Sequence, residues 1–223
     1  MLPRRLTEPP LVKEPWICGF TVHLLVNPCL SERVRYNTPM SFFWQAILVE
    51  GGLAVIALAV GLGIGINYQE YCQFDGGTLC SITWGLLPLV AGYFVLQALP
   101  IAGLQRIDRL VRELFQQHMG HLALWQLALI AALAGIGEEL FFRGMLQQGL
   151  AFFVDVWLAV LISSLIFGLA HAATPTYFFL AFIISLYLGF LFVHTDNLLV
   201  PIAVHALYDF AVFLYIRFTP GKN

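Results

Sequence analysis

Long apolar stretches alternate with short polar segments over most of the chain. Each stretch is close to the roughly 20 apolar residues that a helix needs to cross the hydrocarbon core of a bilayer. The pattern predicts about six membrane-spanning helices, at residues 42–66, 82–100, 122–150, 156–171, 176–194 and 198–216. The third stretch is long enough to tilt or overshoot, and the fourth is the shortest. We therefore predict an all-α, polytopic transmembrane helix bundle.

A different pattern lies between the second and third stretches. Apolar residues recur there at helical spacing from Leu104 to Phe115, while Arg106, Arg109 and Arg112 lie on other faces of the same helix. This pattern predicts a basic amphipathic helix that lies on the membrane surface instead of crossing the bilayer.

The chain ends differ in composition from the spans. Residues 1–40 contain several prolines and basic residues but no uninterrupted apolar core of signal-peptide length. We expect them to form a cytoplasmic N-terminal tail or surface segment, followed by a transmembrane helical domain at 41–217 and a cytoplasmic tail at 218–223. The protein should therefore be held in the membrane by its own spans.

Basic residues are distributed unevenly around the predicted spans. The loops at 67–81, 151–155 and 195–197 contain no Lys or Arg, whereas basic residues precede the first span, follow the second and follow the sixth. Because cytoplasmic loops are enriched in Lys and Arg, both termini are predicted to be cytoplasmic. We expect a multi-pass integral membrane protein, located in the plasma membrane if the protein is bacterial.

Composition supports a membrane protein and excludes some partners. The chain is 60% hydrophobic and 11% charged, whereas about a quarter of the residues of a soluble domain are charged. Its net charge of -2 comes without a long Lys/Arg block, so nucleic acid is not an expected partner. The lipid bilayer is the expected surroundings.

Four cysteines lie outside the predicted spans, Cys18 and Cys29 near the N-terminus and Cys72 and Cys80 in a polar loop. None forms a close C-x-x-C pair, so structural zinc is poorly supported. Cys72 and Cys80 fit either a local disulfide in an oxidising compartment or two free thiols.

Ionisable residues inside the spans are few and concentrate in the C-terminal half. Each costs at least ~2.5 kcal/mol to insert into a membrane, so a cluster of them needs a reason. The cluster comprises Glu50, Glu138, Glu139, Arg143, His171, His205 and Asp209. Glu50 lies within the first predicted span and receives no role from the sequence.

The two adjacent carboxylates should have different roles, because helical geometry separates Glu138 from Glu139 by about 100° around the axis. Glu139 and Arg143 are four residues apart and can neutralise each other on one face. Glu138 points toward Phe142 without a local cation, a setting that suits proton transfer. The alternative is that these charges form a buried ion-pair network that only locks helices together.

Two further pairs of residues occur at a spacing of four. Phe167 and His171 share one helix face, and so do His205 and Asp209. Asp209 is expected to orient His205 by accepting one ring N–H, which leaves the other ring nitrogen free. The alternative is a His–Asp pair that fills the bundle core.

Three short motifs therefore follow one another on successive predicted helices: Glu138-Glu139-x-x-x-Arg143, Phe167-x-x-x-His171 and His205-x-x-x-Asp209. This arrangement resembles the CPBP or Abi family, which contains intramembrane proteases related to the CAAX prenyl endopeptidase and to bacteriocin-processing and self-immunity proteins. The resemblance covers roughly residues 82–216.

The resemblance implies a role for each motif. Glu138 and His171 would activate a water molecule, while His205 and Asp209 would face the oxyanion of the tetrahedral intermediate. The sequence has Asp209 where Asn is typical of the CAAX-endopeptidase branch. An ionised Asp cannot donate a hydrogen bond to an oxyanion, so Asp209 would instead orient or charge His205 unless it is protonated. The expected supporting residues are Glu139, Arg143 and Phe167.

The expected function is an intramembrane endopeptidase that hydrolyses peptide bonds of a membrane-associated protein or peptide by direct water attack. No cofactor is expected. The close alternative is a zinc protease with Glu138, His171 and His205 as ligands, which we disfavour because a metal would occupy Glu138 and leave no obvious base. Two alternatives from other classes are a non-enzymatic immunity or scaffold protein and a small proton-coupled transporter.

Overall fold

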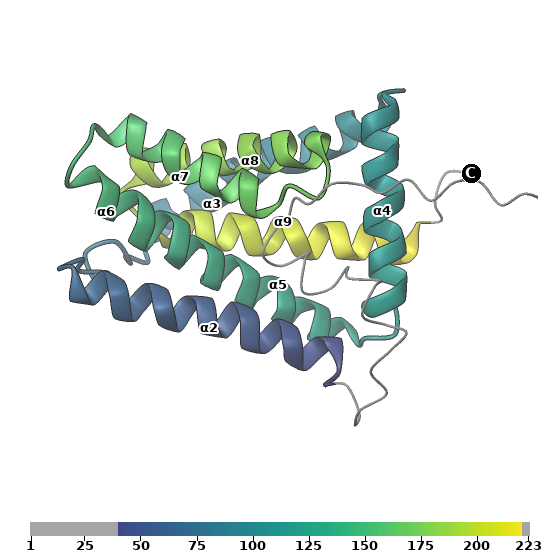
Figure 1. The fold of residues 1–223 in the computed structure, drawn as a ribbon, viewed down its shortest axis with the longest axis horizontal. Coiled ribbons are helices and arrows are strands. Elements are labelled where there is room, and N and C mark those ends of the chain that lie inside the picture. The colour runs from purple at the N-terminus through teal and green to yellow at the C-terminus, as the bar shows by residue number, and fades with distance from the viewer. Residues whose placement is uncertain (1–39, 220–223) are drawn as a thin grey trace, which may run out of the picture.

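The computed structural model describes residues 40–219, and all regular elements in that range are helical. Most of the helices run side by side in one bundle, and one crosses its end (Figure 1). The bundle contains α2 (Phe42–Gly63), α3 (Gly76–Ala98), α5 (Leu124–Glu139), α7 (Val156–Ala170), α8 (Pro175–Thr195) and α9 (Leu199–Phe218). This architecture confirms the predicted all-α membrane bundle.

Within residues 40–219, five helices are long and apolar enough to cross a membrane: α2, α3, the continuous helix Leu124–Ala151, α8 and α9. By contrast, α7 has 15 residues. At 1.5 Å per residue its length is about 22 Å, which falls short of a hydrocarbon core of about 30 Å. It packs along α8 within the bundle (Figure 1). The six predicted spans are therefore five long helices and one short one.

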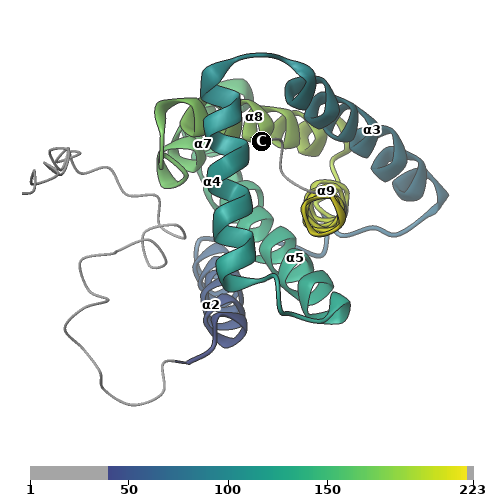
Figure 2. The same ribbon diagram turned by 90° about the vertical axis from the view of Figure 1, so that its right-hand side faces the viewer.

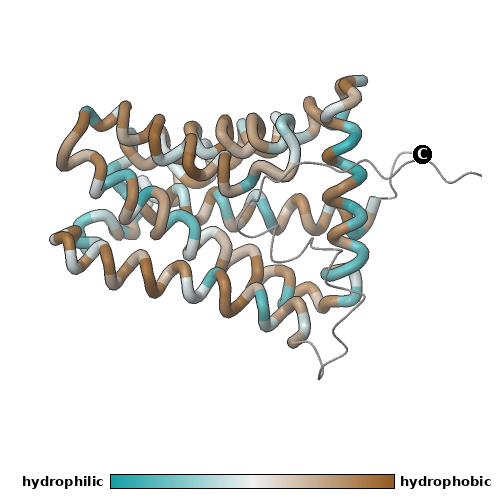
Figure 3. Tube along the Cα trace, viewed as in Figure 1, coloured by the Kyte–Doolittle hydropathy of each residue, from teal (hydrophilic) through white to brown (hydrophobic). Residues whose placement is uncertain are grey.

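The helical spacing of apolar residues predicted an amphipathic helix in this region, and the structure contains it as α4 (Ala102–His118). It runs across the end of the bundle (Figures 1 and 3). Its Ile107 and Phe115 are buried, whereas Arg106 and Arg109 are exposed. Arg112 pairs with Asp108 at 3.0 Å on the same helix. The apolar face of α4 thus covers the bundle, and two arginines lie on its outer side.

The start of α3 differs from the prediction by six residues, because the apolar stretch was expected to begin at residue 82 and the helix begins at Gly76. The reason is a capping box. Asp75 accepts a hydrogen bond from the backbone N–H of Thr78 at 2.7 Å, and Thr78 Oγ1 accepts one from the backbone N–H of Asp75 at 3.3 Å. The backbone N–H and the hydroxyl of Thr78 both donate to the Asp75 carboxylate and lower its pKa. Polar capping residues thus begin the helix before its apolar part.

Helix α9 lies centrally, where it packs against α5, α3 and α8 (Figure 2). Glycines allow α5 to approach its neighbours closely. A Cβ at Gly135 would lie 2.7 Å from the carbonyl oxygen of Ile202 on α9, and one at Gly137 would collide with the carbonyl oxygen of Glu50 on α2. The absence of side chains at these positions lets the backbones meet beside Glu138.

The outer surface of the bundle is apolar. Large side chains such as Leu62, Trp84 and Phe190 are exposed on the long helices, as expected for helices whose solvent is lipid. Cys72 and Cys80 are exposed free thiols, which decides between the two alternatives left by the sequence. Cys18, Cys29 and nearly all of the predicted N-terminal tail lie outside the described residues, as do residues 220–223.

Candidate active site

The helix that carries the two adjacent carboxylates changes its winding immediately after them. At Leu140, α5 continues into the π-helix η2 (Leu140–Gln147), which is followed by α6 (Gln148–Ala151). Short π-helical segments within α-helices occur frequently at functional sites. The sequence predicted an uninterrupted α-helix here, since apolar periodicity does not distinguish one winding from the other over so short a segment.

The predicted pair of Glu139 and Arg143 is present and fully buried. Arg143 Nη1 donates to Glu139 Oε1 at 2.9 Å, while Nη2 donates to the backbone carbonyl and the hydroxyl of Ser185, each at 2.8 Å. The same oxygen of Glu139 lies 2.7 Å from Nδ1 of His205. Glu139 therefore joins α5, η2 and α9, and the guanidinium extends this connection to α8.

The contact between Glu139 and His205 differs from the expected pairing of His205 with Asp209. Because a carboxylate only accepts, Nδ1 of His205 carries the proton and donates it to Glu139. Asp209 Oδ2 lies 3.5 Å from the other ring nitrogen, Nε2. The ring is thus oriented chiefly by Glu139. No local spacing indicated this, since the two residues are 66 positions apart.

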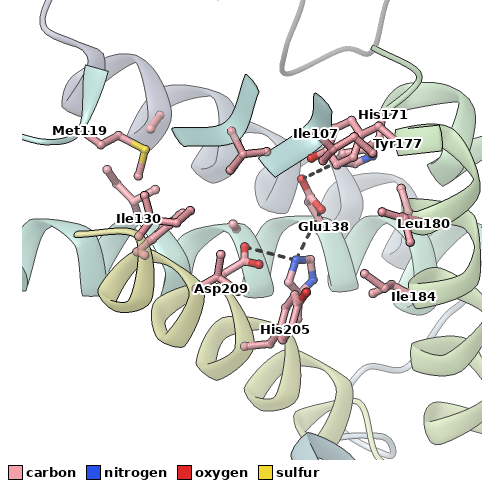
Figure 4. A pocket seen from close by; sticks show the side chains of 18 of the residues that line it. Ile107, Met119, Ile130, Glu138, His171, Tyr177, Leu180, Ile184, His205 and Asp209 are labelled. Carbon is pink, nitrogen blue, oxygen red and sulfur yellow. Dashed lines mark ion pairs between the residues drawn. The ribbon is translucent and has the colours of Figure 1, made fainter. Parts of the chain in front are cut away.

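Glu138 lies between two imidazole rings (Figure 4). Its Oε1 is 3.7 Å from Nε2 of His171, and its Oε2 is 3.8 Å from Nε2 of His205. Both distances are longer than a direct hydrogen bond, and each oxygen of the carboxylate faces a different ring. The sequence offered Glu138 no partner on its own helix, and the tertiary structure supplies two from α7 and α9.

His171 is the C-terminal cap of α7, and two contacts hold its ring. The ring stacks on Phe167 with centroids 4.2 Å apart, and Nδ1 donates to the Phe167 carbonyl at 2.8 Å. In the neutral ring, Nε2 therefore bears the lone pair, which faces Glu138. Phe167 also lies 5.2 Å below the guanidinium of Arg143. Its ring also meets the ring of His205 edge-on, with centroids 6.4 Å apart, so the predicted supporting residue contacts all three motifs.

A cavity of about 680 Å³ opens on this cluster. Its walls are mainly apolar, and Tyr177, Leu180 and Ile184 of α8 line it close to the histidines (Figure 4). Ile107 of α4 lines it as well, so the surface helix forms part of the wall. Such a volume is typical of sites that hold a small ligand or part of a peptide. Glu138, His171, His205 and Asp209 all face this one space.

Ser163 lies on α7, the helix that ends at His171. Its hydroxyl is buried and donates to the carbonyl of Phe142 at 2.8 Å. This bond serves a backbone group of the π-helical segment. The residue therefore braces α7 against η2, and nothing in its position supports a serine nucleophile.

The zinc alternative needs a set of ligands that converge on one point. Within residues 40–219, no group of three or more His, Cys, Asp or Glu side chains is arranged to hold a metal ion. Glu138, His171 and His205 lie together, but the carboxylate oxygens separately face the two ring nitrogens. We derive no step through a metal from this arrangement.

Reasoning from sequence missed two residues of this region. Ser185 gives Arg143 two acceptors, yet a serine in an apolar helix carries no signal of such a role. Glu50 was noted without a role, and it lines the same cavity as Glu138. Its position in a span was the only signal that singled it out.

The segment that carries the three motifs matches a model of a known protein family. Residues 120–211 match the model described as type II CAAX prenyl endopeptidase Rce1-like, and that segment contains all three motifs. No curated protein and no solved structure matches the chain. Residues 120–211 are thus similar to the Rce1-like endopeptidases, which confirms the predicted resemblance to the CPBP family of membrane proteases.

Proposed function

We propose that this protein is an intramembrane endopeptidase that hydrolyses peptide bonds of a membrane-associated protein or peptide with water activated by Glu138 and His171, without a metal. The observation that carries the proposal is the position of Glu138 between two imidazoles at an apolar cavity. A carboxylate there has proton acceptors and donors beside it, and bulk water is largely excluded.

In the first step a water molecule binds between Glu138 and His171. The lone pair on Nε2 of His171 orients one O–H, and the carboxylate of Glu138 accepts the other proton as the water oxygen attacks the peptide carbonyl carbon. At 3.7 Å the facing atoms of the two side chains are too far apart to bond to each other directly, so both stay available to a water in the cavity. The carbonyl π electrons move to oxygen, giving a tetrahedral oxyanion.

His205 is the proposed donor to that oxyanion. Glu139 holds its Nδ1 at 2.7 Å, so Nε2 faces the cavity. When the ring is protonated, Nε2–H donates to the developing negative charge, the interaction that most strongly stabilises such intermediates. Asp209, 3.5 Å from Nε2, supplies an opposite charge beside the imidazolium.

In the last step the intermediate collapses. Glu138 passes its proton to the peptide nitrogen, the C–N bond breaks, and the electrons of the oxyanion restore the carbonyl. The water oxygen remains in the new carboxyl group, and its protons are shared between the two products. The net reaction converts one peptide bond and one water into a carboxylate and an ammonium group.

The test compares protein termini in membranes of cells that express the wild type, Glu138→Gln or Glu113→Gln. Glu113 is an exposed carboxylate on α4 and serves as the matched control. We expect at least one new N-terminus with the wild type and the control, and none with Glu138→Gln at equal membrane abundance. Identical termini in all three samples would instead favour the non-enzymatic scaffold alternative.

A further inference from the structure

Another carboxyl side chain, that of Glu50, lines the cavity and has no role in the proposed reaction. Glu50 lies on α2, outside the Rce1-like segment, and is only 5% exposed. Its Oε2 is completely buried and has no hydrogen-bond partner among residues 40–219. By contrast, Glu138, Glu139 and Asp209 each lie within 3.8 Å of a histidine or arginine nitrogen. Glu50 is thus the unpaired acid of the site.

The backbone holds this side chain next to the reacting groups. The carbonyl oxygen of Glu50 touches α5 at Gly137, where a Cβ would collide with it. Gly137 immediately precedes Glu138 in the chain. Glu50 lines the same cavity as Glu138, His205 and Asp209. A group bound by Glu50 would therefore lie beside the peptide bond that Glu138 hydrolyses.

The charges along the cavity leave one acid unmatched. Three acids, Glu50, Glu138 and Asp209, line the cavity together with only two imidazoles, those of His171 and His205. Asp108 of α4 also lines the cavity, but Arg112 neutralises it at 3.0 Å. An unpaired carboxyl group away from water is costly to ionise, and a cation brought by a ligand lowers that cost.

We propose that Glu50 determines substrate specificity by binding a basic side chain, Lys or Arg, in the substrate segment that occupies the cavity. The inference rests on the proposed function. The apolar walls accommodate the methylene groups of such a side chain, while the carboxylate receives its charged head group in a charge-assisted hydrogen bond.

The experiment uses the purified protein in phospholipid nanodiscs with fluorogenic apolar peptides. Each set of peptides places Lys, norleucine or Glu at one position, and the position is scanned along both sides of the cleaved bond. Norleucine has a similar chain without the charge. At one position we expect kcat/KM for Lys to exceed that for norleucine by about 10- to 100-fold, the range of a charge-assisted hydrogen bond.

In Glu50→Gln, which is nearly isosteric, the ratio of Lys to norleucine at that position should fall close to one. In the matched control Glu113→Gln the ratio should be unchanged. If Glu50 only supports the fold, both rates fall together and the ratio persists, which overturns the inference. The inference also fails if the wild type shows no preference for Lys at any position.

The outcomes separate the inference from the proposed function. If the wild type and Glu138→Gln leave every peptide of the library intact, the proposed function fails, and the inference fails with it. If the wild type cleaves peptides and Glu138→Gln does not, the function stands, and the ratio in Glu50→Gln decides the role of Glu50 alone.

Discussion

Nδ1 of His205 lies 2.7 Å from Oε1 of Glu139, the same oxygen that accepts a hydrogen bond from Arg143. One carboxylate therefore joins the buried ion pair to the histidine that faces the cavity. The sequence analysis predicted a structural pair of Glu139 and Arg143 and, separately, a catalytic role for His205. Their shared oxygen means that a change at Glu139 reaches both the stability of the bundle and the orientation of the imidazole.

Glu139→Gln should reduce both stability and cleavage. The substitution leaves the guanidinium of Arg143 buried without its counter-charge, which costs about 3–5 kcal/mol in comparable buried pairs. It also removes the negative charge that holds Nδ1 of His205. We expect a lower unfolding temperature in detergent and a large loss of cleavage relative to the wild type.

The double variant Glu139→Gln/Arg143→Met separates these two effects, since it removes both charges of the pair. Its unfolding temperature should recover most of the loss, whereas cleavage should stay low because Nδ1 of His205 still lacks a carboxylate. A double variant no more stable than Glu139→Gln would show that the buried guanidinium is not the source of the destabilisation.

Metal removal should leave the activity intact. The proposed chemistry assigns Glu138 the role of base, and a bound metal would occupy that carboxylate as a ligand. We expect purified protein to contain less than stoichiometric zinc by elemental analysis and to cleave its substrate after dialysis against a chelator. Stoichiometric zinc whose removal abolishes cleavage, and whose return restores it, would establish the zinc alternative.

Gly137→Ala should disrupt the site through the backbone. The added Cβ collides with the carbonyl oxygen of Glu50, and backbone atoms cannot rotate away as a side chain can. Overpacking of this kind typically costs about 1–3 kcal/mol, and separating α2 from α5 would displace Glu138. Thermal unfolding and cleavage should both be impaired.

The matched control for this substitution is Gly92→Ala on α3, where a Cβ meets no atom within 4 Å. Alanine also favours a helix more than glycine does. This variant should be at least as stable as the wild type and fully active. Equal behaviour of the two alanine variants would argue against close packing between α2 and α5.

The N-terminal cap of α3 should make stability depend on pH at the acid end. Hydrogen bonds from Thr78 lower the pKa of Asp75 below its ordinary value of 3.8. The stabilisation is therefore complete above that value and is lost as the pH falls through the lowered pKa of the folded protein. We expect Asp75→Ala to unfold at a lower temperature than the wild type near neutral pH.

Comparing the unfolding temperatures of these two proteins at decreasing pH tests the sign of this effect, because the difference should shrink as Asp75 becomes protonated in the wild type. Asp75→Asn is the control, since asparagine caps helices but does not titrate. A difference between the wild type and Asp75→Ala that grows with acidity would contradict the assignment.

The length of the apolar stretches predicted the membrane-spanning helices well, because lipid imposes a minimum length and an apolar composition on each span. The ranges of the continuous helix Leu124–Ala151, of α8 and of α9 agree with the predicted spans to within a few residues. Capping chemistry was harder to foresee, and Asp75 starts α3 before its apolar stretch begins. The apolar stretch that forms α7 was the shortest of the predicted spans, and the structure shows that this helix is too short for a typical span.

The sequence by itself determined which ionisable residues lie inside the spans and which residues share a helix face, since a spacing of four residues is a local property of one helix. It therefore found Glu139 with Arg143 and Phe167 with His171. Only the tertiary structure decided which helices meet. The packing of α5 against α9 and of η2 against α7 places Glu138 between two imidazoles and brings His205 to Glu139, and the packing of α2 brings Glu50 to the same cavity. These contacts join residues far apart in the chain, and they depend on backbone approaches at glycines that no periodic pattern encodes.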